Sequence, residues 1–466
     1  MILILQSKRQ EDMAHEQLTA ISPLDGRYAE KTSELTEIFS EYGLIRFRVE
    51  IEIRWLQMLS NNPDIIELDR FDKDTNNQLN DIIDNFNTDD AKSVKDIERT
   101  TNHDVKAVEY FICQQFKDNK NINDFIHFGC TSEDINNLAY AMMLDEARKN
   151  VLNPLMGSLH QEIQNLVMKY HSIPMLSRTH GQTASPTTVG KEFANILARL
   201  NLISNDFNAI HIYGKFNGAV GNFNAHHIAY PNCDWPEISS SFIKSLNLEP
   251  NILTTQIEPH DWMAKYCHNL IRYNTVLLDM SRDIWGYISL GYFKQRLEKN
   301  EVGSSTMPHK INPIDFENAE GNLGLSNSLF GHFAEKLPIS RFQRDLTDST
   351  VQRNLGVAIG YGIIAIKSLL KGISKLEIDT AIINKDIENR WEVLGEAIQT
   401  VMRRYGISES YEKLKTLTRG NEINKSILSE FIQSLDIPDH AKKELLNLTP
   451  PTYTGLASEL SKQLSI

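Results

Sequence analysis

Residues 300–313 bring together side chains that could move a proton on an anionic substrate. Gly303, Ser304 and Ser305 can present successive backbone N–H groups to an anion, since glycine permits the unusual backbone angles that such a cradle needs. Lys310 adds a positive charge and Asn312 adds an amide. The segment predicts a loop that closes on a negatively charged substrate and carries a hydroxyl at its tip, with a solvated surface turn as the alternative.

Two histidines are further candidates for proton transfer or substrate contact. His180 lies within the predicted loop Ser177–Pro186, and His103 lies at a predicted helix start. An imidazole has an unperturbed pKa of about 6.5, which suits proton transfer near neutrality. The alternative for His180 is an ordinary surface histidine, and for His103 it is a structural hydrogen bond at the start of its helix.

Thr131 and Ser132 precede two acidic residues, Glu133 and Asp134. This order is typical of a helix N-cap, in which a hydroxyl and a carboxylate two or three residues later satisfy the first backbone N–H groups. A helix N-terminus capped in this way also binds carboxylates well. The structural and the substrate-binding interpretations are therefore compatible.

Long helices are the elements that must position these side chains. The 15 prolines leave four long stretches free, and proline inside a helix costs about 3 kcal/mol. Apolar residues recur at helical spacing over Tyr42–Leu59 and Phe193–Ile210, whereas strand-like alternation is scarce. We predict an all-α fold. The proline-free stretches are 64–153, 187–230, 260–307 and 339–437, and the predicted loops are Ser177–Pro186, Gly214–Pro236 and Asn300–Pro313.

Composition excludes several classes of protein. The 466 residues include 48 Lys+Arg and 61 Asp+Glu, a net charge of −13, which argues against nucleic-acid binding but leaves room for a locally basic pocket. The apolar run at residues 1–5 is too short for a signal peptide or a membrane span. The four cysteines form no C-x-x-C pair, and His226, His227, His260 and His268 lack convincing metal-ligand spacing. We expect a cytoplasmic protein without a metal or membrane association.

The segment Gly303–Pro313 resembles the G-S-S-x-M-P-x-K-x-N-P signature of the fumarase/aspartase superfamily. Other segments resemble its bacterial adenylosuccinate lyase branch, and the likeness runs from about Leu18 to the C-terminal region. The first dozen residues look like an extension, and His226-His227 doubles a histidine where one is expected. The matching segments are Thr101–Lys106, Ser177–Gln182, Lys215–His226, Asp315–Asn318, Glu320–Gly324 and Arg344–Thr350.

This resemblance implies a fold, an assembly and a reaction. The fold is all-α with three domains, at residues 1–120, 121–373 and 374–466, the middle one a bundle of long helices. Four chains form a homotetramer in which each active site combines segments of three subunits. The reaction is a β-elimination of fumarate from anionic nucleotides, namely N6-succinyl-AMP, giving AMP, and the succinyl-carboxamide imidazole ribotide SAICAR, giving AICAR. No cofactor is implied.

The resemblance also assigns roles to residues. It favours Ser304 over Ser305 as the general base, and the positive charge of Lys310 would help to ionise the serine hydroxyl. It implies that His180 is the general acid and that Glu317 orients it. His103 is implied to contact the substrate rather than to donate the proton. The further residues implied to bind the substrate are Arg27, Tyr28, Asn102, Asp104, Thr131, Ser132, Gln256, Asn312, Asn318, Arg344, Ser349, Thr350 and Arg353.

The sequence allows three other interpretations. A sister lyase of the same superfamily, such as fumarase or argininosuccinate lyase, is the nearest; His309 and the arginines directed at a phosphate count against fumarase. A catalytically silent helical oligomer need not keep Ser304, His180, Glu317 and Lys310 together, yet all four are present. A nucleic-acid-binding regulator conflicts with the net charge of −13.

Overall fold

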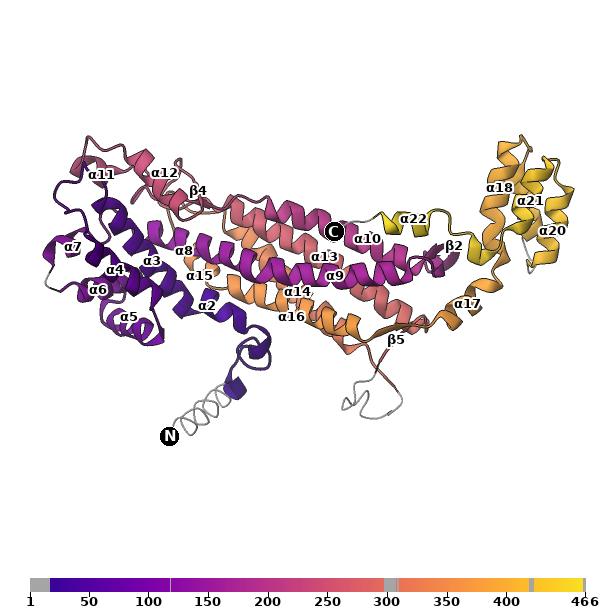
Figure 1. Ribbon diagram of the computed structural model, residues 1–466, viewed down its shortest axis with the longest axis horizontal. Coiled ribbons are helices and arrows are strands. Elements are labelled where there is room, and N and C mark those ends of the chain that lie inside the picture. Colours follow the sequence, from indigo (N-terminus) through magenta and orange to yellow (C-terminus); the bar gives the residue numbers. More distant parts are fainter. Residues whose placement is uncertain (1–16, 118, 297–306, 308–309, 419–422, 464–466) are drawn as a thin grey trace. The chain divides into compact units, whose positions relative to one another are not determined.

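The computed structural model describes residues 17–117, 119–296, 307, 310–418 and 423–463, and it is mostly helical (Figure 1). This confirms the predicted fold class. The expected N-terminal extension, Ser304 and His309 lie outside the described residues. Among those described, the strands form three small sheets of two strands each.

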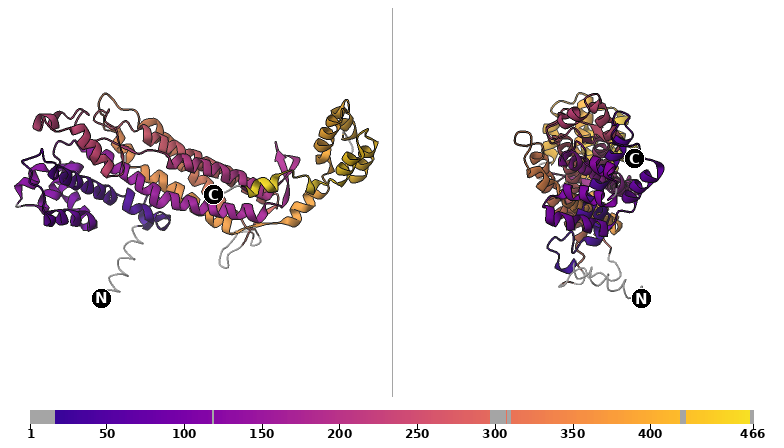
Figure 2. Two further views of the ribbon diagram at one scale, coloured as in Figure 1. Left: turned by 45° about the horizontal axis from the view of Figure 1, so that its top comes forward. Right: turned by 90° about the vertical axis from the view of Figure 1, so that its left-hand side faces the viewer.

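The described chain divides into two compact units, each assembled from separate segments. Unit 1 comprises segments 1–156, 204–275 and 321–367, and unit 2 comprises segments 157–203, 276–320 and 368–466. Five long helices contribute to both, and within each unit their segments lie side by side (Figures 1 and 2). The three domains expected from the sequence stay a prediction. The five helices are α9 (Asn153–Tyr170), α10 (Val189–Asn208), α13 (Asp261–Ser289), α14 (Ile314–Lys336) and α16 (Leu355–Ser374).

The two predicted apolar stripes are helices. The first is α3 (Glu41–Ser60), which Ser40 caps by accepting the Gly43 backbone N–H at 3.1 Å, and the second is α10. Five of the six stripe residues of α3 and all seven of the second stripe are buried. Helical spacing of apolar residues therefore located both core faces correctly.

Unit 1 is built from short helices at the start of the chain and from segments of the long ones. In its bundle part, Asn274 on α13 donates to Ser326 on α14 at 3.1 Å, and Ser326 donates to the Ala358 carbonyl on α16 at 2.9 Å. Its other elements include α2 (Thr36–Phe39), α4 (Lys73–Asp84), α5 (Thr88–Thr101), α6 (Asp104–Gln115), α7 (Lys120–Phe125), α8 (Ser132–Glu146), β3 (Tyr213–Gly214), α11 (Asn224–Ala229), α12 (Trp235–Ser245), β4 (Glu249–Pro250) and α15 (Thr347–Gln352).

Unit 2 contains a second hydrophobic core, formed by the C-terminal helices. Ile398, Met402, Leu428 and Ile432 are among its buried members, and Leu176 packs with them. The elements of this unit include β1 (Pro174–Thr179), β2 (Gln182–Thr188), β5 (Phe293–Gln295), β6 (Leu376–Ile378), α17 (Thr380–Glu388), α18 (Gly395–Arg404), α19 (Ser410–Thr418), α20 (Lys425–Ser434), α21 (Asp439–Asn447) and α22 (Ala457–Lys462).

Two of the predicted loops contain regular structure. Ser177–Pro186 is most of an antiparallel hairpin, β1–β2, so its prediction as a loop was wrong. Its threonines favour a strand, and the turn residues that suggested a loop occupy only its tip. Gly214–Pro236 includes the short helix α11, and most of Asn300–Pro313 lies outside the described residues.

One stretch, Thr347–Ser374, is long and apolar enough to cross a membrane by length and composition. Its most apolar 18-residue window is 67% buried within the protein. Such burial is typical of a core helix, and we interpret the stretch in that way.

Candidate active site

The N-terminus of α8 is tied to the glycine-rich turn by one buried carboxylate. Asp134 accepts the Thr131 backbone N–H through Oδ2 at 2.8 Å, which confirms the predicted cap. Its Oδ1 accepts the Asn217 backbone N–H at 3.0 Å and pairs with the buried Lys215 ammonium at 2.7 Å. Thr131 and Ser132, both expected to bind substrate, are therefore held on a rigid helix end whose N–H groups favour anions.

Arg344 is anchored beside this helix end. Its Nη1 lies 2.7 Å from Glu133 Oε2, and its Nη2 lies 3.7 Å from Asp348 Oδ1. Because Glu133 follows Ser132 and Asp348 precedes Ser349, these pairs bring four of the predicted substrate contacts into one neighbourhood: Thr131, Ser132, Arg344 and Ser349. A guanidinium next to a helix N-terminus is suited to bind a phosphate or a carboxylate.

A second basic group surrounds Asp104 at the start of α6. The buried Arg48 reaches Asp104 Oδ2 at 2.8 Å, and Arg353 reaches the same oxygen at 3.1 Å. Arg353 also pairs with Glu41 at 2.7 Å. Burial by itself raises the pKa of Asp104, but the two guanidiniums outweigh it, so the pKa lies below its usual value. Asp104 is therefore ionised at neutral pH and fixes Arg353 at the surface.

His103 is the N-cap of α6. Its Nδ1 accepts the Lys106 backbone N–H at 3.1 Å. A neutral imidazole has one acceptor and one donor nitrogen, so the proton of the neutral ring lies on Nε2. The structural hydrogen bond considered as the alternative role of His103 is therefore present. It leaves the Nε2–H group as an exposed donor, which suits the expected substrate contact.

His180 lies at the tip of the β1–β2 hairpin. Thr179 pairs with Gln182, so His180 and Gly181 form a two-residue turn, and both have positive φ, at 52° and 75°. Positive φ at both central positions is the requirement of a type I′ turn, which glycine meets without strain. The turn leaves the His180 residue exposed.

The hairpin is anchored by Arg178. Its Nη1 donates to Thr183 Oγ1 at 2.9 Å, and its Nη2 donates to the Tyr292 hydroxyl at 3.1 Å and pairs with Asp386 on α17. The Tyr292 hydroxyl also donates to Asp386. The backbone that carries His180 is thus fixed to α17 and to the Tyr292 side chain, although the imidazole itself is exposed.

Glu317, the expected partner of His180, lies exposed on α14. It accepts the Trp285 indole N–H at 3.1 Å, and within the described part of unit 2 no hydrogen bond joins it to His180. The pairing of these two residues stays a prediction for the assembled protein. Asn318 accepts the Ser368 hydroxyl at 2.8 Å, and Lys310 is exposed in an irregular segment that also contains Asn312.

The remaining predicted contacts belong to unit 1. Gln256 donates to the Ala219 carbonyl at 2.8 Å and so helps to hold the glycine-rich turn. The Arg27 guanidinium lies 5.9 Å from the ring centre of Tyr28. Asn102 ends α5 in a left-handed conformation, and Thr350 is exposed on α15. Hence unit 1 contains most of the predicted substrate contacts, and unit 2 contains His180, Glu317, Lys310, Asn312 and Asn318.

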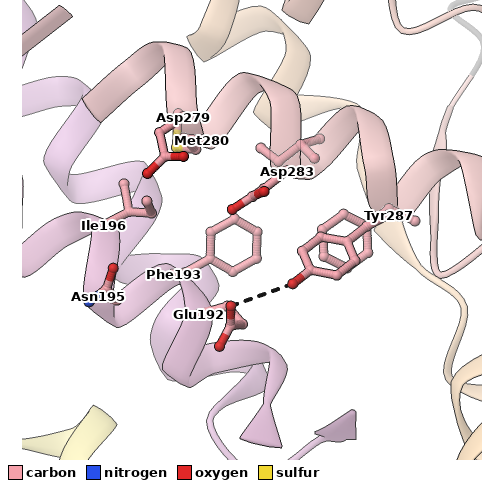
Figure 3. Close-up of a pocket in the computed structure, with 10 residues that line it drawn as sticks. Glu192, Phe193, Asn195, Ile196, Asp279, Met280, Asp283 and Tyr287 are labelled. Carbon is pink, nitrogen blue, oxygen red and sulfur yellow. Dashed lines mark hydrogen bonds between the residues drawn. The ribbon is translucent and has the colours of Figure 1, made fainter. Parts of the chain in front are cut away.

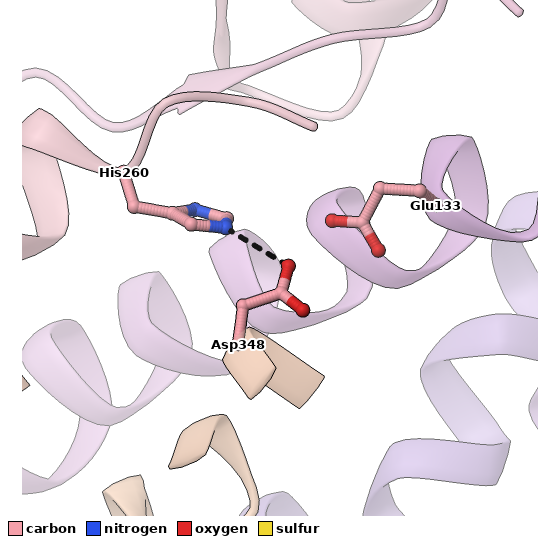
Figure 4. A group of neighbouring side chains, drawn as sticks. All are labelled: Glu133, His260 and Asp348. Carbon is pink, nitrogen blue, oxygen red and sulfur yellow. Dashed lines mark ion pairs between the residues drawn. The ribbon is translucent and has the colours of Figure 1, made fainter. Parts of the chain in front are cut away.

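A buried group that contacts Arg344 is not evident from the sequence. Glu133, His260 and Asp348 each place one ligand atom within 4.8 Å of the others, a spacing that could hold a metal ion (Figure 4). The three residues are far apart in the sequence, so no motif could reveal them. The Arg344 guanidinium already contacts Glu133 at 2.7 Å and thus supplies the positive charge that a metal would bring.

A pocket of unit 2 is lined by none of the predicted site residues. It is lined by α10, α13 and Phe293, and its acidic side chains are Glu192, Asp279 and Asp283 (Figure 3). Burial raises the pKa of Glu192, and Glu192 accepts from the Tyr287 hydroxyl at 3.4 Å. Its acidic lining does not suit an anionic nucleotide, so this pocket is not a candidate for the site.

Comparison with known proteins decides the family. A family model described as Lyase matches residues 26–325, and one described as Adenylosuccinate lyase C-terminal matches residues 340–454. The chain is 55% identical to the adenylosuccinate lyase of Haemophilus influenzae over 96% of this chain and 99% of that one. It belongs to the adenylosuccinate lyase family. The predicted family and the enzyme class, a carbon–nitrogen lyase, are confirmed.

Other adenylosuccinate lyases and two solved structures agree with this assignment. The enzyme of Escherichia coli K12 is 52% identical over 96% of this chain and 99% of its own. The 3-carboxy-cis,cis-muconate lactonizing enzyme of Pseudomonas putida has a TM-score of 0.73 at 18% identity, covering 92% of this chain and 96% of its own. The fumarate lyase of Mesorhizobium sp. BNC1 has a TM-score of 0.72 at 16% identity, covering 92% and 97%. These two structures show that the fold is shared.

Proposed function

We propose that this lyase eliminates fumarate from N6-succinyl-AMP, giving AMP, and from SAICAR, giving AICAR. The observation that carries the proposal is the identity of 52–55% with adenylosuccinate lyases over nearly the whole chain. The anion-binding geometry around α8 and α15 supports it. No metal or cofactor takes part in the proposed reaction, and the protein is a cytoplasmic homotetramer that binds neither nucleic acid nor membranes.

The substrate is anchored by its charged ends. Arg344 and Arg353 bind the phosphate, because a guanidinium fork matches two phosphate oxygens. Thr131 and Ser132 bind a carboxylate at the N-terminus of α8, where the helix dipole favours negative charge. His103 donates its Nε2 proton to a substrate oxygen. The other contacts come from Arg27, Tyr28, Asn102, Asp104, Gln256, Asn312, Asn318, Ser349 and Thr350.

The chemistry is one proton removal and one proton donation. The Ser304 oxygen takes a proton from the carbon beside a carboxylate, which leaves a carbanion whose charge spreads onto that carboxylate. The electron pair then forms the C=C bond of fumarate as the C–N bond breaks, and His180 protonates the departing nitrogen. Lys310 and the N–H groups of its loop stabilise the negative charge that develops. Glu317 orients His180.

Each site combines side chains of three subunits in this proposal. On a single chain, the residues His103, His180 and Glu317 are all exposed, as they must be if neighbouring subunits complete the site. This exposure agrees with an assembly in which the hairpin tip, the start of α6 and the start of α14, contributed by different subunits, meet at a common substrate.

Replacing Ser304 with alanine tests the chemical role. The Ser304→Ala variant is expected to lose at least about a thousandfold in kcat, because the base is gone, yet to bind the substrate with nearly unchanged affinity. Turnover is followed by absorbance of adenylosuccinate, and binding by calorimetry. Ser305→Ala is the matched control and should keep most of its activity. Turnover of Ser304→Ala close to that of the unmodified enzyme would refute the assignment of the base.

A further inference from the structure

Glu133, His260 and Asp348 form a buried polar cluster behind Arg344. They come from the first turn of α8, the residue before α13 and the start of α15, and their exposed fractions are 2%, 0% and 4% (Figure 4). Burying ionisable groups is costly unless they are paired. The burial of these three side chains therefore requires charged or hydrogen-bonding partners.

The two carboxylates hold the two terminal nitrogens of one guanidinium. Glu133 Oε2 lies 2.7 Å from Arg344 Nη1, and Asp348 Oδ1 lies 3.7 Å from Nη2. A guanidinium is planar, so two carboxylates on different nitrogens restrict both its position and the orientation of its plane. The Arg344 side chain keeps 17% of its surface exposed, which is the part that a ligand can reach.

His260 supports Asp348 from behind. Its Nε2 lies 3.7 Å from Asp348 Oδ2 and 3.4 Å from Gln352 Nε2, and its Nδ1 lies 3.7 Å from Glu258 Oε2. Glu258 in turn accepts the His260 backbone N–H at 2.7 Å. Burial raises the pKa of Asp348, but the His260 and Arg344 contacts outweigh it and lower it overall. Asp348 is thus kept ionised next to the guanidinium.

The cluster is not optimised for stability alone. Glu133 Oε1 and Asp348 Oδ2 are buried without a hydrogen-bond partner in the structure. A buried acceptor without a partner destabilises the folded state, because its lost hydration is not replaced. Local arrangements that lose stability in this way are expected at functional sites.

We propose that Glu133 and Asp348, supported by His260, are positioning residues that hold the Arg344 guanidinium for the phosphate of the substrate. The inference rests on the proposed function, in which Arg344 binds that phosphate. Glu133 and Asp348 are also the chain neighbours of Ser132 and Ser349. The same two carboxylates therefore fix the position of the guanidinium relative to the N-terminus of α8 and to the Ser349 hydroxyl, which contact the ligand in the proposed function.

The test compares two ligands that differ only in the phosphate, AMP and adenosine. In Glu133→Gln, which keeps the shape of the side chain and removes its charge, AMP is expected to bind roughly tenfold more weakly, as for the loss of one charged hydrogen bond. Adenosine is expected to bind within about twofold of the unmodified enzyme, KM for adenylosuccinate to rise, and kcat to stay within about threefold. Equal weakening of AMP and adenosine would overturn the inference, since it would indicate a general structural defect.

Two further variants separate this inference from the proposed function. Arg344→Met is expected to weaken the binding of AMP and to leave the binding of adenosine unchanged. If it does not, Arg344 does not bind the phosphate, and the inference fails together with that part of the proposed function. If Arg344→Met weakens the binding of AMP but Glu133→Gln does not, only the inference is overturned. In the double variant, Glu133→Gln should add little to the effect of Arg344→Met, because both act on one contact.

A matched control and a second positioning variant complete the design. Glu52 is a buried carboxylate of the same unit that pairs with His127 at 2.6 Å and does not contact Arg344, so Glu52→Gln should leave the ratio of AMP to adenosine affinity unchanged. If Glu133→Gln does not fold, Asp348→Asn gives the same readout. Unchanged AMP affinity in the folded Asp348→Asn variant would then overturn the inference.

Discussion

His103 uses its two ring nitrogens for different purposes. Nδ1 accepts the Lys106 backbone N–H at 3.1 Å and so caps α6, which leaves Nε2 as the exposed donor of the neutral ring. Asparagine is also a good N-cap but has no nitrogen in the place of Nε2. The structural and catalytic contributions of this residue can therefore be separated by two substitutions.

We predict that His103→Asn keeps the free energy of unfolding within about 0.5 kcal/mol, whereas His103→Ala lowers it by about 1 kcal/mol because the cap is lost. Both variants should lose roughly 10- to 100-fold in kcat/KM, as expected for removing a hydrogen bond to a charged substrate. Urea unfolding and steady-state kinetics measure the two effects. A His103→Asn variant with unchanged kcat/KM would limit His103 to its capping role.

At the same scale, some site residues could be predicted from the sequence and others could not. The cap formed by Thr131 and Asp134 was predictable because its partners are three positions apart. The surroundings of Arg344 were not, because Glu133 and His260 are distant from it in the chain and only folding brings them together. Local spacing cannot identify contacts of this kind.

Among the elements, the β1–β2 hairpin carries the proposed acid. Its tip holds His180 in a left-handed turn, and its strand β1 is fixed to α17 through Arg178 and Asp386. These two residues are 208 positions apart, so no local sequence pattern indicates the anchor. The stripe of α3, by contrast, was visible because helical periodicity is a local property.

Loosening this anchor should slow the reaction without unfolding the protein. Asp386→Asn removes the charge that holds Arg178, and we expect kcat to fall by about tenfold or more, because a small displacement of a catalytic group is costly. KM should change little, since the proposed phosphate contacts belong to other elements. Glu412→Gln, which removes the charge that pairs with Lys415 at 3.1 Å on α19 of the same unit, is the control and should leave kcat unchanged. An unchanged kcat in Asp386→Asn would show that the anchor does not position His180.

For the whole molecule, the proposal requires that subunits share their sites. If Ser304 and His180 of one site come from different chains, a mixture of two inactive variants must regain activity. Mixing Ser304→Ala with His180→Gln in equal amounts, after subunit exchange has been verified by native mass spectrometry, should restore about a quarter of the original sites by random assembly.

The same experiment has a control within the chain. Ser304 and Lys310 are six positions apart and belong to one predicted loop, so a mixture of Ser304→Ala with Lys310→Met should regain nothing, because no subunit would contribute both side chains. Recovery in the first mixture and not in the second supports shared sites. Failure of the first mixture, with exchange demonstrated, would contradict them.

The most direct test of the account is the reaction itself. Purified protein is incubated with adenylosuccinate in the presence of a metal chelator, and the loss of substrate absorbance is compared with the AMP and fumarate formed. We predict sustained turnover with one AMP and one fumarate per substrate consumed, at a rate that the chelator does not change. No turnover of adenylosuccinate by the folded protein, with or without the chelator, would contradict the proposed function.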